Sequence, residues 1–455
     1  MSSTSPSLHK GNTNTARPAS TSEKVPASPT TSVDCIKGTA DPDDADKTKD
    51  VQLDEDWQFP EGGYGWVVVG GFSLIMFVTL GLSTSWEVFQ EYYQANLLKD
   101  HSPSDIAWIG SVQYSLIFFP GLIAGRLFDL GHFHVSMAVA SALLIIGSFL
   151  VAECTTYWQL MLTQGLIIGI AGGFLFGPGS PLISHWFRRR RATAYGVTTG
   201  CGATGSVVLP IAIRNLIPMI GFKWTMRLVG FIDLLALGIA NSVLRARLPP
   251  KSVKGSLFNI AAFKSAPYAL LVAALFTAYM GLYTTLTYVD VAGVAIGLDP
   301  KFTFYLVPIA NAGSFFGRLI AGVLSDRFGP YNMLILFGVV AAITTFVWPY
   351  CFTKGSLIVL VIFNGTAAGA FVSLSPAPIA LLDTANLGQR TGMMFTIMAI
   401  GALVGPPISG AIHQSVGGFK DSAAYAGSML SVSCILLVCS RRMASIRLAQ
   451  IKRSK

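Results

Sequence analysis

The stretch "IAGVLSDRFGP", residues 320–330, places an acid next to a base between two long apolar runs. Only 12% of the chain is charged, so Asp326 and Arg327 stand out against their surroundings. The apolar runs on both sides predict membrane-spanning helices. The charged pair then predicts a short loop at the membrane surface, between two of these helices.

The apolar pattern continues through the rest of the chain. With 455 residues, 52% hydrophobic residues and a mean hydropathy of +0.56, the chain is more apolar than a soluble domain. A β-barrel would instead show short alternating strands. Hydrophobic segments of about 20 residues, the length a helix needs to cross the hydrocarbon core, recur along the sequence. They predict an all-α membrane protein with twelve transmembrane helices, near residues 65–86, 106–127, 133–152, 157–177, 192–212, 222–243, 267–289, 302–323, 331–350, 355–376, 391–411 and 422–440.

A second copy of the opening stretch lies in the first part of the chain. The segment "PGLIAGRLFDLGH" (120–132) aligns with "GRLIAGVLSDRFG" (317–329). Each copy follows the second predicted helix of its own set of six, so the repeat predicts two pseudo-symmetric six-helix halves. The alignment pairs two positions, 197 residues apart in each case: Gly125 with Gly322, and Asp129 with Asp326.

Composition divides the chain into five predicted parts. Residues 1–60 are rich in Ser, Thr and Pro and contain acidic patches, which predicts a disordered cytoplasmic tail. The other four parts are a first six-helix bundle at 61–245, a basic cytoplasmic linker at 246–266, a second six-helix bundle at 267–440 and a basic cytoplasmic tail at 441–455.

The distribution of Lys and Arg predicts the orientation in the membrane. If the N-terminus is cytoplasmic, the inside loops and the C-terminal tail hold eighteen Lys and Arg residues, against seven in the outside loops. The positive-inside rule therefore places both termini in the cytosol. The "RRRR" run at 188–191 belongs to this asymmetry, and its surroundings do not predict nucleic-acid binding.

The sequence does not predict an enzyme or a metal site. The six cysteines form no CxxC pair, and the six histidines are scattered, mostly in predicted loops. An integral-membrane enzyme would need reactive groups clustered at a suitable spacing. We therefore expect no catalytic residue, no bound metal and no cofactor.

The repeated stretch resembles a known family signature. The pattern G-x-x-x-D-R-x-G between the second and third helices of each half is similar to the signature loop of the major facilitator superfamily. In that family the loop acts as a latch, a contact that holds the two halves together when the protein faces outward. The resemblance implies the major facilitator fold and a latch formed by Gly125, Asp129, Gly322, Asp326 and Arg327. Because Leu130 stands where a basic residue is usual, the second copy is expected to be the stronger latch. The alternative is a loop that only stabilises helix ends.

Other segments resemble one branch of that superfamily, the monocarboxylate-transporter-like proteins. "EGGYGWVVV" (61–69) looks like the start of their first helix, and "HWFRRRRATAYGVTTGCGATGS" (185–206) like their basic loop and fifth helix. "GLYTTLTYV" (281–289) and "GPPISG" (405–410) are similar to their seventh and eleventh helices. The Ser/Thr-rich tail looks like the fungal branch. The resemblance implies a transporter of small organic molecules, often carboxylates.

Proline-containing segments predict interruptions of the apolar helices. They are "GPGSP" (177–181), Pro210, Pro308, "SPAP" (375–378) and "GPP" (405–407). Such breaks are tolerated where a helix borders protein or a water-filled cavity. This pattern agrees with a transport pathway between the halves.

The seventh predicted helix, 267–289, carries many hydroxyl groups for a lipid-exposed segment. In the superfamily the first, fourth, seventh and tenth helices line the cavity, which implies substrate binding by Tyr283, Thr284 and Tyr288. The alternative is that these hydroxyls bond carbonyls of the preceding turn. Three weaker candidates with similar alternatives are Asn311, Ser314 and Asn364.

Arg318 is the most informative single residue. It lies eight residues before Asp326, about 12 Å deeper by the helical rise, and so within the bilayer. The first half has Gly121 at the matching position, so the repeat does not require an arginine there. A charge inside the membrane is costly and usually functional, and a guanidinium suits a carboxylate. In the monocarboxylate family an arginine at this point binds the substrate anion. The alternative is an arginine that snorkels toward the cytoplasm.

Two departures from the monocarboxylate pattern bear on proton coupling. The family carries an Asp one turn before that arginine and a Lys in the first helix, whereas this chain has Ser314 and Thr84 at the aligned positions. Proton symport of the lactate type is therefore not expected. Asp233, an acid within the sixth predicted helix, is the candidate for any proton coupling.

These observations together predict a secondary active or facilitative transmembrane transporter of a small organic molecule, with a carboxylate as the expected substrate, working by alternating access. Two alternatives stay open: an efflux transporter for a secondary metabolite, and a nutrient sensor that uses a transporter scaffold without transporting. The predicted partners are a small-molecule substrate and the lipid bilayer, with neither a nucleic acid nor an obligatory protein partner. The expected location is the plasma membrane, with the vacuolar membrane as the alternative.

Overall fold

The structure is a computed structural model that describes residues 61–247, 259–382, 387–416 and 418–454. These residues belong to one compact unit, Phe59–Lys455. The predicted N-terminal tail and residues 248–258 of the predicted linker lie outside the described residues. All regular elements in the described ranges are helices, which confirms the all-α prediction.

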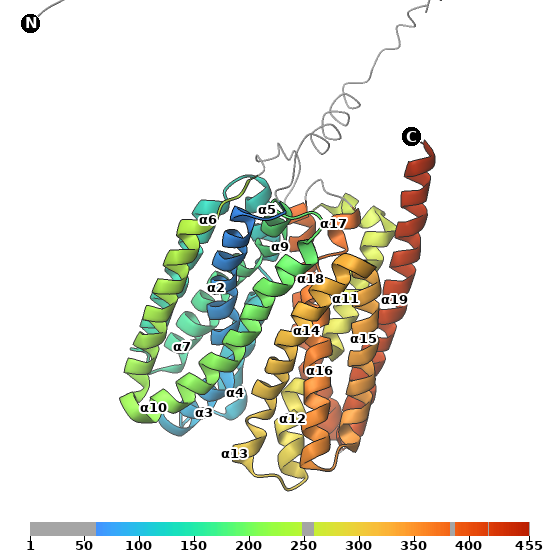
Figure 1. Ribbon diagram of the computed structural model, residues 1–455. Helices are drawn as coiled ribbons and strands as arrows, with labels where there is room; N and C mark the ends of the chain where they lie inside the picture. The colour runs from blue at the N-terminus through green and yellow to red at the C-terminus, as the bar shows by residue number, and fades with distance from the viewer. Residues whose placement is uncertain (1–60, 248–258, 383–386, 417, 455) are drawn as a thin grey trace, which may run out of the picture. The chain divides into compact units, whose positions relative to one another are not determined.

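The first half runs from α2 to α10 and occupies the left of Figure 1. α2 begins at the same end of the bundle at which α19 ends, and this end is called the terminal end below. The opposite end is called the distal end. The bounds are α2 Tyr64–Thr84, α3 Trp86–Tyr92, η1 Tyr93–Leu97, α4 Pro103–Leu116, α5 Gly121–Asp129, α6 Phe133–Val151, α7 Tyr157–Leu160, η2 Met161–Ile168, α8 Gly169–Phe176, α9 Gly179–Ser184 and α10 Arg191–Val243.

The second half runs from the short 3-10 helix η3 to α19 and occupies the right of Figure 1. Its last helix continues well past residue 440, through most of the predicted basic tail. The bounds are η3 Ile260–Lys264, α11 Ala266–Leu282, α12 Thr284–Ala295, α13 Pro300–Thr303, α14 Leu306–Phe328, α15 Pro330–Val347, η4 Trp348–Tyr350, α16 Lys354–Leu374, α17 Ile379–Leu382, α18 Leu387–Val416 and α19 Phe419–Ser454.

Eleven helical stretches in the described residues are long and apolar enough to cross a bilayer. One of them, α10, has 53 residues and contains a non-helical glycine, Gly221, with φ 79° and ψ 160°. Residues 191–220 and 222–243 on either side each exceed the ~20 residues that a span needs. α10 therefore supplies the fifth and sixth spans, and the prediction of twelve is confirmed.

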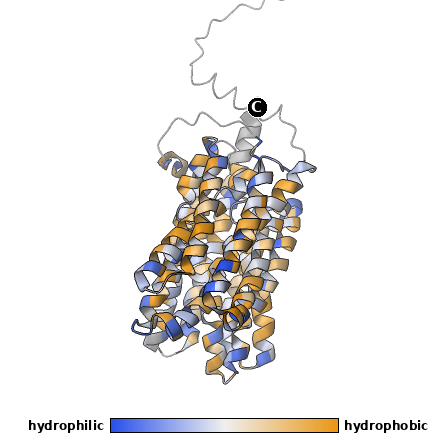
Figure 2. Cartoon of the chain, turned by 90° about the vertical axis from the view of Figure 1, so that its left-hand side faces the viewer, coloured by the Kyte–Doolittle hydropathy of each residue, from blue (hydrophilic) through white to orange (hydrophobic). Residues whose placement is uncertain are grey.

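The outer faces of the helices are apolar, as lipid contact requires. Figure 2 shows hydrophobic residues along most of the helix length, with hydrophilic residues gathered mainly near the ends. Large side chains such as Val135, Leu235 and Phe316 are 65%, 67% and 60% exposed. In water, apolar surface of this extent would promote association, whereas lipid solvates it.

The predicted proline interruptions are only partly correct. Helical structure does break at 177–178 and at 375–378, between α8 and α9 and between α16 and α17. Pro210, however, lies inside α10, and Pro406 and Pro407 lie inside α18. Pro308 is in the first turn of α14, where a missing N–H breaks no helical hydrogen bond. A proline alone therefore did not predict a break, because neighbouring helices can hold the chain on course.

Candidate substrate site and gate contacts

The two halves meet at the terminal end along two helix pairs, α5 with α18 and α10 with α14. At the first seam, a Cβ added to Gly125 would overlap the carbonyl of Gly388, and one added to Gly392 would overlap the carbonyl of Gly121. At the second, a Cβ on Gly322 would lie 2.7 Å from the Ala192 carbonyl oxygen. The seams are thus backbone-to-backbone contacts that glycine makes possible.

The two aspartates of the repeated stretch make matching contacts across these seams. Asp326, in α14, accepts hydrogen bonds from the backbone N–H groups of Ala192 (3.0 Å) and Thr193 (2.8 Å). Asp129, at the end of α5, accepts them from Gly388 (3.1 Å) and Gln389 (2.7 Å). Each carboxylate therefore lies at the first turn of a helix in the other half, where unpaired N–H groups and the helix dipole favour an anion.

The contacts of the second copy do not include its basic residue. Arg327 is exposed, and no hydrogen bond or ion pair joins it to another described residue. The expectation that the second copy is the stronger latch because of Arg327 finds no support in this geometry. Both aspartates have two backbone donors, and the latch role of the five residues stays a prediction.

Arg318 lies near the middle of α14 and faces the other half. Its Nη1 donates to the carbonyl oxygen of Thr199 in α10 at 2.8 Å, and its Nε donates to Ser314 Oγ at 3.1 Å. The other terminal nitrogen, Nη2, has no hydrogen bond within the described residues. The cation is therefore positioned by two bonds while one side of its fork stays available for an anion.

Four tyrosine hydroxyls lie within electrostatic range of this guanidinium. They belong to Tyr114 and Tyr195 in the first half and to Tyr279 and Tyr283 in the second. The Tyr114 and Tyr283 rings meet edge to face across the halves, 5.6 Å between centroids. Tyr283 lies between the end of α11 and the start of α12.

Apolar rings extend this cluster. Phe118 lies 6.0 Å from Tyr279 and 5.3 Å from Phe176, and Phe176 lies 5.2 Å from Phe395 of α18. These four rings are buried. By contrast, Tyr114, Tyr283 and Arg318 keep part of their surface accessible. A molecule that enters between the halves would thus meet a cation, hydroxyl donors and aromatic faces together.

The remaining substrate candidates lie apart from this cluster. Thr284 Oγ1 pairs with Ser409 Oγ at 2.8 Å, and the Tyr288 hydroxyl donates to the Pro406 carbonyl at 2.9 Å. The amide of Asn364 donates to Thr344 Oγ1 at 2.9 Å, within the second half. These side chains contact neighbouring helices, so their geometry favours packing.

Asn311 and Ser314 occupy the Arg318 face of α14. Positions 311, 314 and 318 follow the three- and four-residue spacing of one helix face. Ser314 bonds Arg318 directly, whereas the Asn311 side chain is half-buried and has no hydrogen bond within the described residues. Of the candidates from sequence, Arg318, Ser314, Asn311 and Tyr283 are therefore grouped by the fold.

Asp233 lies away from this group. Its side chain is fully buried on the second part of α10, where Oδ2 accepts a hydrogen bond from Ser148 of α6 at 2.7 Å. Both residues belong to the first half. The contact joins two helices of one bundle, so a role in proton coupling stays a prediction without geometric support.

Sequence reasoning missed Tyr114 and Tyr195 and left Tyr279 among the general hydroxyls of its helix. A tyrosine within an apolar run is common in membrane helices, and the 3.6-residue period does not show which half it faces. The signal that does exist is local: Tyr195 stands four residues before Thr199, the residue that accepts from Arg318.

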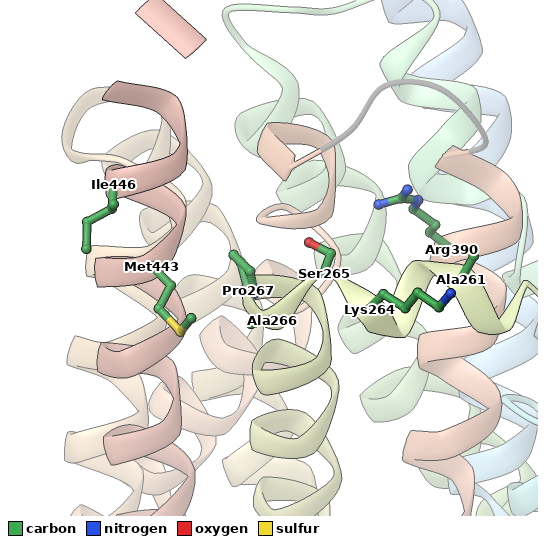
Figure 3. A pocket seen from close by; sticks show the side chains of 8 residues that line it. All are labelled: Ala261, Lys264, Ser265, Ala266, Pro267, Arg390, Met443 and Ile446. Atoms are coloured by element: carbon green, nitrogen blue, oxygen red, sulfur yellow. The ribbon is translucent and has the colours of Figure 1, made fainter. Parts of the chain in front are cut away.

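A cavity of about 600 Å3 lies elsewhere, at the terminal end of the second half. Figure 3 shows Lys264 and Arg390 on one side of it and Met443 and Ile446, from α19, on the other. The described residues that line it come only from η3 and the segment after it, α11, α18 and α19. Arg390 directly follows the Gly388–Gln389 pair that bonds Asp129, but no residue of the Arg318 group lines the cavity, so it is not part of the Arg318 site.

Comparison with known families matches nearly the whole helical region. The model of the Major Facilitator Superfamily matches residues 65–377 and 312–448. The chain belongs to the major facilitator superfamily. As a member of that superfamily it is a multi-pass membrane transporter and not an enzyme, as the sequence predicted.

Relatives within the superfamily are fungal proteins. One, named as the aspyridones efflux protein of Emericella nidulans, is 36% identical over 383 residues, covering 83% of this chain and 78% of the relative. A transporter of an Ophiocordyceps species is 33% identical and covers 88% of this chain and 91% of its own. The agnestins efflux protein of Paecilomyces divaricatus is 30% identical over 82% of this chain and 86% of its own.

Solved structures of the superfamily share the fold. The human organic anion transporter MFSD10 superimposes with a TM-score of 0.66 at 16% identity, over 84% of this chain and all of its own. The Escherichia coli fucose:proton symporter FucP gives 0.64 at 13% identity, over 81% of this chain and 98% of its own. At this identity the likeness concerns the fold alone.

Proposed function

We propose that this chain exports a small organic anion, a secondary metabolite, by alternating access. Its membership of the major facilitator superfamily makes it a transporter. Two relatives are named as efflux proteins of particular metabolites, and these names favour the efflux alternative over uptake of a simple carboxylate. The monocarboxylate-like branch, suggested by the "EGGYGW" and "HWFRRRR" segments, is part of the proposal.

The proposal that the substrate is an anion rests on Arg318. A guanidinium with two bonds to protein and a free Nη2, set beside four tyrosine hydroxyls, has the donors that a carboxylate, an enolate or a phenolate would need. The neighbouring rings of Phe118 and Tyr283 favour a substrate with a flat, conjugated part, because stacked or edge-on ring contacts add to apolar burial.

Alternating access is supported by the seams at the terminal end. Both are closed by backbone N–H groups that donate to Asp326 and Asp129, and by close backbone contacts at glycines. Backbone contacts of this kind can part without disengaging long side chains, and opening also separates the ring contacts of Phe118 with Tyr279 and of Phe176 with Phe395. Following the charge asymmetry, we propose that the terminal end is cytoplasmic and that the gate is closed on that side.

Deletion of the gene in its source organism tests the proposal. Untargeted mass spectrometry of cells and medium should show an anionic metabolite that accumulates in the deletant and falls in the medium. Wild-type protein should restore export, and the Arg318→Gln variant should not. If the accumulating metabolite is neutral, the substrate is not an anion. If its concentration in the medium rises in the deletant, the chain does not export it. An unchanged metabolite profile would refute metabolite transport and favour a nutrient sensor.

A further inference from the structure

The two segments that mark the start of α2 and the start of α10 contact each other at the terminal end. The rings of Tyr64 and Trp186 lie 5.6 Å apart, and those of Trp66 and Phe187 lie 5.1 Å apart. A Cβ on Gly65 would lie 3.1 Å from the Phe187 ring. The "EGGYGW" and "HWFRRRR" segments therefore pack as one unit within the first half.

Glu61 joins this unit through its carboxylate. Oε1 accepts hydrogen bonds from the backbone N–H groups of Arg188 (2.8 Å) and Arg189 (2.5 Å), and Oε2 accepts from that of Arg190 (3.2 Å). Glu61 has φ 50°, a left-handed backbone conformation that a non-glycine residue rarely adopts. A strained conformation persists where its surroundings determine it, and three hydrogen bonds from successive residues meet that condition.

These bonds end where α10 begins. Arg190 is the N-cap residue of α10 and makes no side-chain capping bond. The N–H groups of Ala192 and Thr193, in the first turn of α10, are the ones that bond Asp326 of the other half. Two carboxylates thus share the start of α10: Glu61, from the same half, and Asp326, from across the seam.

At the other seam, the described residues show no such arrangement. The repeat relates Gly125 to Gly322 and Asp129 to Asp326 by an offset of 197 residues, and the residue 197 positions after Glu61 is Phe258. The start of α18, which bonds Asp129, therefore has no carboxylate at the equivalent sequence position. Each seam has an aspartate that accepts backbone hydrogen bonds from the other half, whereas Glu61 bonds only the residues before α10.

We propose that Glu61 is a positioning residue of the gate. It holds residues 188–190 so that the N–H groups of Ala192 and Thr193 stay directed at Asp326, including while the seam is open. Closing the α10–α14 seam then requires no reordering of the first turn of α10. The inference builds on the proposed alternating access but not on the identity of the substrate.

A double-mutant cycle on purified protein tests this role. Spin labels at Val135 in α6 and Leu336 in α15, which are 65% and 49% exposed, report the separation of the halves without substrate. Asp326→Asn and Glu61→Gln should each lower the ratio of closed to open molecules, by about tenfold for the loss of a charge-assisted contact. Because Glu61 acts through Asp326, the double variant should differ little from Asp326→Asn alone.

Asp129→Asn is the matched control, because Asp129 closes the seam that Glu61 does not touch. When Asp129→Asn is combined with Glu61→Gln, the ratio of closed to open molecules should fall by the product of the two single-variant factors. Glu61→Asp keeps the charge with a shorter side chain and should restore part of the closed population; it also replaces Glu61→Gln in the cycle if that variant does not fold. The proposal would be overturned if Glu61→Gln lowered the ratio by the same factor in the Asp326→Asn and Asp129→Asn backgrounds. An unchanged ratio in Glu61→Gln alone would also overturn it. Since no substrate is present, failure of the export assay leaves this result unaffected.

Discussion

At the scale of the residue, Arg318 is fixed by two hydrogen bonds and still has one unbonded terminal nitrogen among the described residues. It is held by Ser314 of its own helix and Thr199 of the other half, yet Nη2 has no hydrogen bond within the described residues. An arginine that only stabilised the fold would be expected to use its whole fork, since unpaired polar groups are costly inside a bilayer. The free side of the fork therefore favours a ligand.

Replacement of Arg318 separates these roles. We expect Arg318→Gln to abolish transport at near-normal abundance, and Arg318→Lys to rescue it poorly, because an ammonium keeps the charge but loses the planar fork. The lost charge-assisted pair should cost about 2–5 kcal/mol, visible as a large loss of apparent affinity in vesicle transport. Normal affinity in the surviving molecules, with reduced abundance, would instead indicate a structural arginine.

How far the sequence predicts the site differs from residue to residue. Arg318 was predictable because a charge within an apolar run has few explanations. Tyr288 and Asn364 are also polar residues within apolar helices, but their side chains bond Pro406 and Thr344, and no local sequence pattern distinguishes them from Arg318. Tyr114 was not predictable, because its role depends on Tyr283 of the other half, 169 positions away in the chain.

At the scale of the element, the α5–α18 seam depends on small residues at fixed places. Gly121 faces Gly392 and Gly125 faces Gly388, so the helices touch through their backbones. The repeat drew attention to Gly125 of α5 and Gly322 of α14 from sequence alone, but not to Gly121. Their partners in α18 were not predicted, because which helices cross is a property of the whole bundle.

A pair of glycine substitutions tests this contact. Gly392→Ala should shift the molecule toward a separated terminal end, because the new Cβ overlaps the Gly121 carbonyl. Gly70→Ala is the control: it also lies within a helix, and its Cβ would meet nothing within 4 Å. Both substitutions raise helix propensity by about 1 kcal/mol, so only the overlap differs. The distance between labels at Val135 and Leu336 measures the shift; equal distances in the two variants would contradict the seam's importance.

At the scale of the whole molecule, the twelve spans were predictable because each is a continuous apolar run of sufficient length. The boundary between the fifth and sixth was predicted as a loop of several residues, whereas the structure has a turn at Gly221 alone. The charge asymmetry still predicts that the terminal end, with the Arg188–Arg191 run, faces the cytosol.

Single-cysteine labelling of intact cells checks that orientation. A cysteine at residue 190 should react with a membrane-impermeant reagent only after the cells are permeabilised. A cysteine at Lys420, which is exposed next to the start of α19 at the distal end, should react in intact cells. The reverse pattern would invert the topology.

Proton coupling is also a property of the whole transport cycle. The hydroxyl of Thr84 donates to the Leu80 and Gly81 carbonyls of its own helix, and Ser314 accepts from Arg318. Neither position carries an ionisable group. We therefore expect transport of the substrate to be nearly independent of an imposed pH gradient. Collapse of transport by a protonophore, with the membrane potential clamped, would contradict this, and Asp233→Asn would then show whether Asp233 carries the proton.

The glycine seams have a thermodynamic consequence. Long side chains that become ordered on contact lose rotamer freedom worth up to about 2 kcal/mol each, whereas glycine has no rotamers to lose. Joining Gly125 to Gly388 and Gly121 to Gly392 therefore adds little conformational entropy cost. Because little side-chain freedom is lost when the seam forms, little of the favourable contact energy is offset, so a few hydrogen bonds at each aspartate can keep the terminal end closed.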